Sequence, residues 1–251
     1  MARILLLGGT SEASELARAL ALRGDDAVFS YAGRTETPKA QPLPMRVGGF
    51  GGIAGLQRYL HAEAITHVID ATHPFAAQMS QNAVAACAKA GVALCAYERP
   101  AWRAEAGDRW THTRDLEAAC VALPRNPARV FLATGRQTLG IFAQRPEHFY
   151  LLRLVDPPQD PLPLPRAEAV IARGPFTESA DLDLLREHRI DLVVAKNAGG
   201  SGAYSKMAAA RALGLPVIVI DRPKLPARRI CGSVQEVLGW LDHGASTERG
   251  E

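Results

Sequence analysis

The chain contains little that points to metal or membrane chemistry. Its four cysteines, Cys87, Cys95, Cys120 and Cys231, form no C-x-x-C pair and show no zinc-binding spacing. No apolar run approaches the roughly 20 residues that a membrane-spanning helix needs, and the apolar run near the N-terminus is too short for a signal peptide. We therefore expect cysteines that pack in the core, a cytoplasmic protein, no bound metal and no membrane partner.

Two further absences argue against nucleic-acid binding and against catalysis by a protein nucleophile. The net charge is only +3, which does not indicate nonspecific binding to nucleic acid, and the sequence has neither a nucleophile elbow nor the spacing of a catalytic triad. The 251 residues, 47% hydrophobic and 22% charged, have the composition of an ordinary globular protein and could form one large or two small domains. What the chain does have is glycine-rich turns at the ends of predicted strands.

The first of these turns follows the apolar segment Arg3–Leu7. The turn contains Gly8, Gly9, Thr10 and Ser11, and an apolar-periodic segment begins directly after it. This pattern predicts a strand, a tight turn and a helix over residues 11–23, with Thr10 or Ser11 as its N-cap and Gly24 at its end. Because the N–H groups at a helix start favour phosphate, we expect these four turn residues to hold a dinucleotide.

The turn departs from the usual dinucleotide fingerprint. It reads Gly-Gly-Thr-Ser-Glu-Ala rather than G-x-G-x-x-G. Glu12 and Glu15 suit the dipole of the predicted helix, but their charges would repel a pyrophosphate unless the side chains point away.

The second predicted strand, Ala27–Ser30, leads to Gly33, Arg34 and Thr35. In dinucleotide-binding folds the residue after this strand meets the adenosine ribose, where an acidic residue suits NAD. Here the candidate is Arg34, whose planar guanidinium matches a 2′-phosphate. The residue therefore favours NADPH, with a solvated loop arginine as the alternative.

Two more segments are expected near the same site. The loop from Gly48 to Gly55 contains Gly49 and Gly51, and it serves either as a hinge or as backbone lying against a ligand. The third predicted strand, residues 67–70, is followed by Thr72 and His73, which should face the same crevice as Gly8. His73 could donate a proton or could be a structural histidine.

Strands and helices alternate again beyond the proline-containing segment Leu123–Pro127. We therefore predict an α/β fold with two Rossmann-like lobes, each a parallel sheet flanked by helices, and a cleft between them. The predicted domains are residues 1–124, which bind NADPH, and residues 125–251, which close the substrate cleft. Arginine or lysine recurs beside glycine or asparagine at the strand ends of the second half, at Arg136, Arg173 and Lys196.

The set of motifs resembles the precorrin-6A reductase family. The segments that carry the resemblance span nearly the whole chain: residues 7–13, 32–35, 48–52, 70–76, 134–136, 173–176, 196–197 with 199–200, and 222–223. The resemblance implies NADPH-dependent reduction of one double bond of the precorrin-6A macrocycle, giving precorrin-6B in cobalamin biosynthesis. It also implies hydride transfer from C4 of the nicotinamide and addition of a proton at the adjacent carbon.

The resemblance also implies which residues contact the ligands. The macrocycle carries many carboxylates, so basic side chains and backbone N–H groups should hold it. The expected substrate-binding residues are Arg136, Arg173, Lys196, Asn197, Gly199, Gly200, Ser201, Lys206 and Arg222. Members of the family often have serine where this chain has Ala198, so a role for that hydroxyl is absent or falls to Ser201.

The sequence alone does not identify the group that donates the proton. His73, Tyr204, Lys196 and a bound water are candidates. Two other functions fit a two-lobed α/β protein: a nucleotide-sugar transferase and a non-catalytic ligand-binding protein. The sequence leaves the oligomeric state open, with a monomer as one option.

Overall fold

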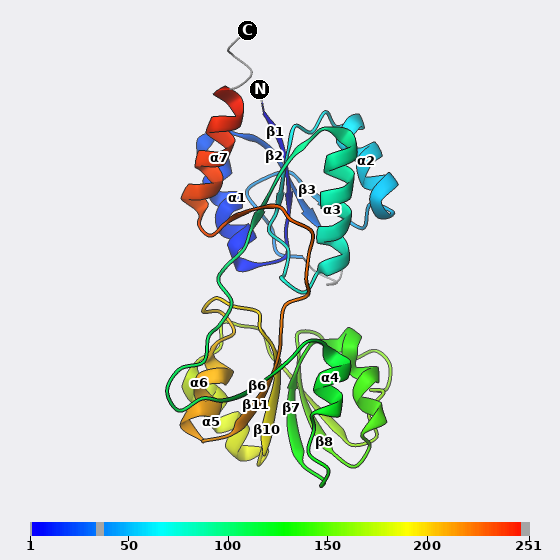
Figure 1. The fold of residues 1–251 in the computed structure, drawn as a ribbon, viewed down its shortest axis with the longest axis vertical. Helices are drawn as coiled ribbons and strands as arrows, with labels where there is room; N and C mark the ends of the chain where they lie inside the picture. The colour runs from blue at the N-terminus through cyan, green and yellow to red at the C-terminus, as the bar shows by residue number, and fades with distance from the viewer. Residues whose placement is uncertain (1, 34–37, 247–251) are drawn as a thin grey trace. The chain divides into compact units, whose positions relative to one another are not determined.

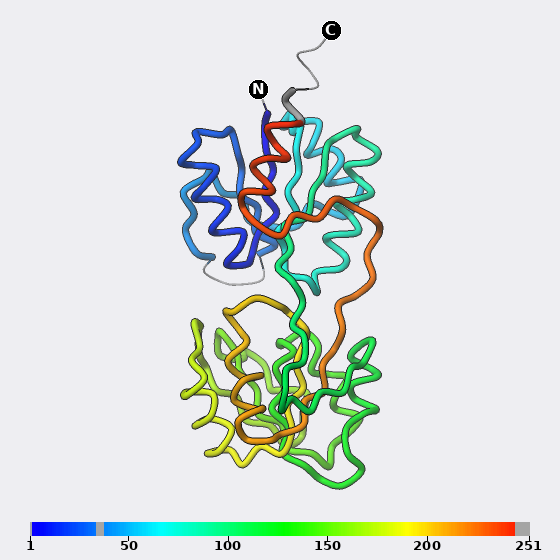
Figure 2. Tube along the Cα trace, turned by 60° about the vertical axis from the view of Figure 1, so that its left-hand side comes forward, coloured from blue at the N-terminus to red at the C-terminus, as the bar shows by residue number. Residues whose placement is uncertain are grey.

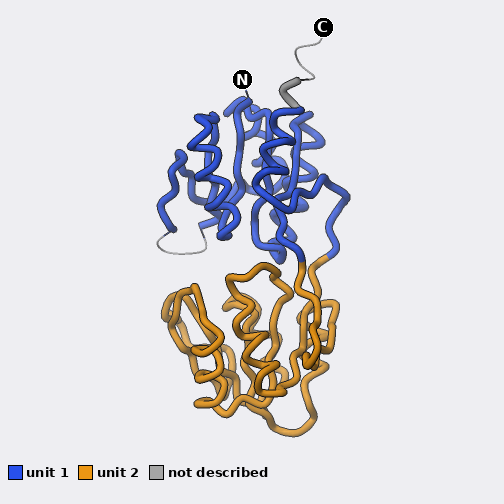
Figure 3. The backbone as a smooth tube through the Cα atoms, turned by 90° about the vertical axis from the view of Figure 1, so that its left-hand side faces the viewer, with its two compact units in different colours: residues 1–100, 224–251 blue, residues 101–223 orange. Residues whose placement is uncertain are grey.

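The computed structural model of the chain describes residues 2–33 and 38–246. These residues fall into two compact units: unit 1 comprises residues 1–100 and 224–251, and unit 2 comprises residues 101–223 (Figure 3). Each unit contains one six-stranded parallel sheet flanked by helices (Figure 1). The predicted α/β class, with two Rossmann-like lobes, is confirmed.

The sheet of unit 1 has the strand order β12-β5-β4-β1-β2-β3. Its strands are β1 (Arg3–Leu7), β2 (Asp26–Tyr31), β3 (Met45–Val47), β4 (His67–Asp70), β5 (Ala93–Tyr97) and β12 (Arg229–Cys231). Its helices are α1 (Ser11–Arg23), α2 (Gly52–Ala62), α3 (Ala77–Ala90) and α7 (Val234–Ser246). The order reverses direction between β1 and β4, where ligands of such sheets bind beyond the carboxyl ends of the strands.

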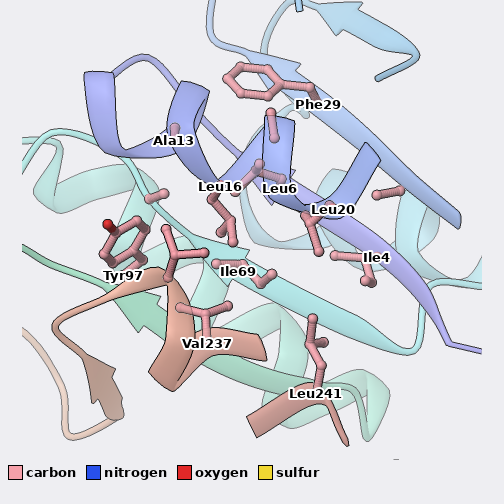
Figure 4. Close-up of a cluster of buried hydrophobic side chains, with 14 of the residues drawn as sticks. Ile4, Leu6, Ala13, Leu16, Leu20, Phe29, Ile69, Tyr97, Val237 and Leu241 are labelled. Carbon is pink, nitrogen blue, oxygen red and sulfur yellow. The ribbon is translucent and has the colours of Figure 1, made fainter. Parts of the chain in front are cut away.

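The alternation of side chains along β1 divides the core of unit 1 into two layers. Ile4 and Leu6 pack in the cluster formed with α1 and α7, which Figure 4 shows. Leu5 and Leu7 point to the opposite face and pack in the cluster formed with α2 and α3. All four side chains are at most 2% exposed, so β1 lies at the centre of the unit.

Unit 2 repeats this architecture with the strand order β6-β11-β10-β7-β8-β9. Its strands are β6 (Arg109–Thr113), β7 (Arg129–Ala133), β8 (Phe149–Leu154), β9 (Ala167–Ile171), β10 (Leu192–Lys196) and β11 (Pro216–Ile220). Its helices are α4 (Leu116–Val121), the 3₁₀ helix η1 (Arg136–Gln144), α5 (Glu178–Glu187) and α6 (Ser205–Ala212). The order reverses between β7 and β10, which gives a second crevice position of the same kind.

The units do not divide where the sequence predicted, at residue 124. Strand β6 pairs in parallel with β11, so residues 101–124 belong to unit 2. Strand β12 pairs in parallel with β5, so the C-terminal segment returns to unit 1, where Figure 2 shows it beside the earlier part of the chain. Both pairings join residues more than a hundred positions apart, and such pairings leave no local signal.

Within residues 2–33 and 38–246, no helix combines the length and the apolar character needed to cross a bilayer.

Candidate functional site

The first helix of unit 1 begins as the sequence predicts. Thr10 is the N-cap of α1, and its Oγ1 accepts a 3.1 Å hydrogen bond from the Ala13 amide. The same hydroxyl donates to the carbonyl oxygen of Ala71 at 2.9 Å, which ties the helix start to the end of β4. Because the first N–H groups of a helix precede its first internal bond, those of Ser11 and Glu12 remain available at this edge of the sheet.

The two glycines before Thr10 serve different purposes. A Cβ built on Gly8 would lie 2.1 Å from Cζ of Phe29, so the buried Phe29 ring requires glycine there. Gly9 has φ of +123°, and a Cβ built on it would meet no atom within 4 Å. The turn therefore leaves open space beside Gly9, at the reversal point between β1 and β4, where a phosphate could approach the backbone.

The acidic side chain in the first turn of α1 is neutralised within unit 1. Arg99, which lies just beyond β5, donates from Nη1 to Oε2 of Glu12 at 2.5 Å. The next ion pair along this edge joins Arg228 to Glu98. The Arg99 pair neutralises the Glu12 carboxylate and so removes its part of the conflict with a phosphate that the sequence raised; Glu15, the other carboxylate in that conflict, is exposed.

A small, open depression lies beside these ion pairs. It is lined by Thr10, Glu12, Thr72, Pro74, Tyr97, Glu98 and Arg99. These residues lie at or just beyond the carboxyl ends of β1, β4 and β5, so Thr10 and Thr72 lie at the same edge of the sheet. The depression adjoins the N-terminus of α1, whose first N–H groups are of the kind that hold phosphate esters. The Thr10 and Thr72 hydroxyls and the Arg99 guanidinium beside it already donate to Ala71, Asp70 and Glu12.

The loop after β4 is fixed by Asp70, a buried side chain that is only 2% exposed. Oδ1 of Asp70 accepts from the Thr72 hydroxyl at 2.6 Å and from the Thr72 amide at 3.1 Å. Nδ1 of His73 accepts from the Phe75 amide at 3.2 Å. In the neutral ring this acceptor role leaves the proton on Nε2, so His73 is both a turn-forming side chain and a group with a proton.

The glycine loop before α2 is held by an arginine that the sequence interpretation did not single out. Nη1 of Arg46 donates to Ser30 Oγ at 2.8 Å and to Gly48 O at 2.9 Å, and Nη2 donates to Gly49 O at 3.2 Å. Its guanidinium lies 3.8 Å from the centroid of the Phe50 ring. Partial burial lowers the pKa of Arg46 below its ordinary value. Gly51 is the N-cap of α2 with φ of +78°.

The residues expected to bind the 2′-phosphate lie partly outside the structure. Gly33 has φ of +77° and follows β2 closely. Arg34 and Thr35 lie outside the described residues, so the structure does not test their predicted contacts.

In unit 2 the predicted substrate residues follow strands that end at one edge of a parallel sheet. Arg136 begins η1 after β7, Arg173 follows β9, Lys196 ends β10 and Arg222 follows β11. Nη2 of Arg173 contacts Asp156 Oδ1 at 2.6 Å, and Nη2 of Arg136 lies 3.9 Å from Asp160 Oδ2. Both arginines are well exposed, so these surface pairs could exchange for carboxylates of a ligand.

Asn197 and Arg222 have structural partners that the sequence did not predict. Oδ1 of Asn197 accepts from the Trp102 amide at 2.8 Å, and its Nδ2 donates to Trp102 O at 3.1 Å. Nε of Arg222 donates to Asn197 O, and its Nη2 donates to Ala198 O, both at 3.1 Å. The indole N–H of Trp102 donates to Gly200 O at 2.6 Å. These bonds attach the loop after β10 to Trp102 and Arg222, which lie next to the first and last residues of unit 2.

The same loop continues into α6 through residues with unusual backbone angles. Gly199 and Gly200 have φ of +71° and +68°, and Ser201 is exposed. Lys206 is 8% exposed, its Nζ donates to Ala203 O at 2.5 Å, and the ammonium lies 5.0 Å from the centroid of a Trp102 ring. Lys206 therefore stabilises this loop through its contacts with Ala203 and Trp102, whether or not its ammonium group also contacts the substrate.

Tyr204, a candidate proton donor, lies in a charged cluster. Its hydroxyl donates to Glu105 Oε1 at 3.1 Å and accepts from Arg211 Nη2 at 2.7 Å. Burial, with the hydrogen bond to Glu105, raises the pKa of Tyr204 above its ordinary value. The phenol thus holds its proton firmly at neutral pH and is a poor acid.

All four cysteines are free and buried, which confirms the expectation that they pack in the core. Burial raises the pKa of the Cys87 thiol to about 12, so this side chain carries no thiolate at neutral pH. In the described part of the chain, no group of three or more histidine, cysteine, aspartate or glutamate side chains could hold a metal ion.

Comparison with known proteins identifies the family. The family model described as Precorrin-6x reductase CbiJ/CobK matches residues 3–242. A precorrin-6A reductase of Rhodobacter capsulatus is 67% identical over 251 residues, covering all of both chains. A precorrin-6A reductase of a Sinorhizobium species is 50% identical over 243 residues, covering 96% of this chain and 93% of the relative.

A solved structure agrees with this assignment. The structure described as CobK precorrin-6A reductase is 67% identical in sequence and superposes with a TM-score of 0.94, covering 97% of this chain and 98% of the other. The match covers both sheets, and the resemblance noted from the sequence motifs points to the same family. The chain is therefore a reductase that belongs to the precorrin-6x reductase CbiJ/CobK family.

Proposed function

We propose that this protein reduces one double bond of the precorrin-6A macrocycle to give precorrin-6B, with NADPH as the reductant. The family match over residues 3–242 supports the reaction. The observation that carries the cofactor side of the proposal is the start of α1. There an open backbone turn at Gly9 and a neutralised Glu12 lie where the strand order of the sheet reverses. A nucleotide-sugar transferase or a non-catalytic binding protein has no comparable support.

The residues of unit 1 fit a dinucleotide. The amides of Ser11 and Glu12 would face the pyrophosphate, and the Thr10 and Thr72 side chains would define the edge of its site. Gly49 and Gly51 would let the loop before α2 approach the adenosine half closely. Arg34 would pair with the 2′-phosphate and distinguish NADPH from NADH. When bound, NADPH supplies the hydride, and the protein orients it.

The basic edge of unit 2 would hold the substrate. A macrocycle with many carboxylates needs several cationic partners in a fixed register, which Arg136, Arg173 and Lys196 could supply. Gly199, Gly200 and Ser201 would contribute backbone N–H groups and a hydroxyl. Lys206, Asn197 and Arg222 would act on the same loop, because their contacts determine its shape.

For the proton, we propose a bound water or His73 rather than Tyr204. The His73 ring accepts at Nδ1 and so carries its neutral-state proton on Nε2. Tyr204 has a raised pKa and is already bonded to Glu105 and Arg211. Replacing His73 with Asn separates the two donors, since a turnover unchanged by that substitution assigns the proton to water.

The proposal includes a cytoplasmic location. Four free, buried cysteines suit a reducing compartment.

The test is turnover of precorrin-6A by the purified protein, followed by the absorbance of NADPH. We expect oxidation of NADPH in equal amount to precorrin-6B formed, and much weaker use of NADH. Absence of precorrin-6A-dependent oxidation with either cofactor would refute the reaction.

A matched pair of variants tests the cofactor contact. Arg34→Ala should weaken NADPH binding by about ten- to a hundredfold, as expected for loss of a charge-assisted contact, and leave NADH binding unchanged. Arg18→Ala removes the same charge from the exposed face of α1 and should change neither affinity. Equal affinity of the unmodified protein for NADPH and NADH would contradict the assignment of NADPH.

A further inference from the structure

A buried ion pair in unit 2 lies outside every motif that the proposed function uses. Asp181, on the first turn of α5, is 1% exposed, and Arg153, near the end of β8, has a side chain that is 12% exposed. Nη2 of Arg153 donates to Oδ1 of Asp181. Such a pair costs desolvation energy, and a well-packed apolar pair would often be at least as stable. Its presence therefore calls for a role beyond stability.

The contacts of the pair reach one of the predicted substrate-binding segments. The Arg153 guanidinium lies 4.1 Å from the centroid of the Phe176 ring, and 5.2 Å from that of Phe131 in the core. Phe176 is three residues beyond Arg173, in the loop that joins β9 to α5. A planar guanidinium stacked on a ring fixes the ring's position and orientation.

The other carboxylate oxygen reaches a second predicted segment. Oδ2 of Asp181 accepts a 2.6 Å hydrogen bond from the hydroxyl of Ser205, the first residue of α6. Ser205 directly precedes Lys206 and follows the loop of Gly199, Gly200 and Ser201. One buried carboxylate thus connects the β9–α5 loop, through Arg153 and Phe176, with the start of α6.

We propose that Asp181 and Arg153 are positioning residues for the tetrapyrrole. They hold the Arg173 loop and the start of α6 in one fixed relative arrangement, so that Arg173 and the loop of Gly199, Gly200 and Ser201 meet carboxylates of the same macrocycle. Neither residue contacts the reacting atoms. The proposal rests on the proposed function, because it takes the carboxylates of precorrin-6A as the ligand groups that these segments meet.

The first test is Asp181→Asn, which keeps the shape of the side chain but removes the charge that holds Arg153. We expect the KM for precorrin-6A to rise about tenfold or more, a smaller change in kcat, and an unchanged dissociation constant for NADPH, which binds at unit 1. Asp183→Asn makes the same change at an exposed position of α5 and should leave all three values unchanged.

The second test avoids the buried charge, since Asp181→Asn could prevent folding. Phe176→Leu removes the stacked ring and leaves the ion pair in place, and we expect the KM for precorrin-6A to rise severalfold at unchanged NADPH affinity. Phe176→Tyr keeps the ring over the Arg153 guanidinium and should retain the KM of the unmodified protein.

The outcomes distinguish a failure of the proposed function from a failure of the positioning role. If the unmodified protein does not reduce precorrin-6A, the proposed function fails. If it does, and a folded Asp181→Asn or Phe176→Leu protein has an unchanged KM, the positioning role is overturned. An equal loss with leucine and tyrosine at position 176 would also overturn it.

Discussion

The side-chain amide of Asn197 is bonded at both ends by the backbone of one residue, Trp102. Oδ1 accepts from the Trp102 amide at 2.8 Å, and Nδ2 donates to the Trp102 carbonyl at 3.1 Å, although the residues are 95 positions apart. Asn197 is 5% exposed, so water cannot replace these bonds readily. The start of unit 2 is thereby attached to the loop after β10.

Removing this amide should destabilise unit 2. Asn197→Ala leaves a buried donor and a buried acceptor on Trp102 unsatisfied, which we expect to lower the free energy of unfolding by about 1–3 kcal/mol. Urea unfolding followed by tryptophan fluorescence measures the change. Asn126→Ala, at an exposed position, should have an effect near zero. A similar stability for both variants would show that the bonds to Trp102 contribute little.

Arg99 should support cofactor binding through Glu12. With Arg99→Ala, the Glu12 carboxylate remains at the start of α1 without its partner at 2.5 Å. Its repulsion of the pyrophosphate should weaken NADPH binding by about tenfold, or roughly 1.4 kcal/mol. The measurement is a fluorescence titration with NADPH at low salt. Adding Glu12→Gln should restore most of the affinity, and a double variant as weak as the single one would exclude charge repulsion as the cause.

Gly8 should tolerate no side chain. The Cβ of Gly8→Ala would lie 2.1 Å from Cζ of Phe29, a ring that is fully buried in the core. We expect a loss of about 1–3 kcal/mol, the usual range for overpacking, detected as a lower thermal midpoint. Gly140→Ala is the control, because a Cβ there meets no atom within 4 Å. Equal midpoints for the two variants would show that the Phe29 ring moves aside at little cost.

His148 should make the protein less stable in mild acid. Its ring is fully buried, its Nδ1 accepts from the Ala128 amide at 3.1 Å, and burial lowers its pKa below the ordinary value in spite of the nearby Glu147. Below about pH 6.5 the unfolded chain therefore binds a proton that the folded protein excludes. The contribution to stability is complete above this pH and decreases as the pH falls toward the folded-state pKa.

Urea unfolding at pH 7.5 and 5.5 measures this dependence. The decrease in midpoint between the two should become smaller in His148→Gln, and His61→Gln, at an exposed position, should retain it. A decrease of the same size in all three proteins would assign the pH dependence to other groups.

Local patterns predicted the local elements well. The predicted helix over residues 11–23 and its end at Gly24 agree with the structure, and its N-cap is Thr10, one of the two predicted candidates. Caps, glycine terminators and apolar stripes lie within a few residues of each other in the sequence, so they can be recognised without a structure.

Features that depend on distant residues could not be found in this way. Nothing near Glu12 indicates that Arg99, 87 positions away, neutralises it. The three-residue strand β12 has too short a pattern to detect, and its pairing with β5 decides the boundaries of the units. The buried partners of Arg153 also come from separate elements. The family could nevertheless be identified from the sequence, because its motifs are short segments that contain glycine and basic residues and lie at the ends of strands.

The pairing of β12 with β5 has a consequence for how the protein is made. The ribosome produces the first five strands of the unit 1 sheet early, and then all of unit 2, before it reaches Arg229–Cys231 and α7. During that interval the outer edge of β5 and the apolar surface later covered by Val237 and Leu241 lack their final partners. The nascent chain therefore carries an unfinished N-terminal sheet throughout the synthesis of residues 101–223, and only the segment from β12 to α7, which is translated after unit 2, completes it.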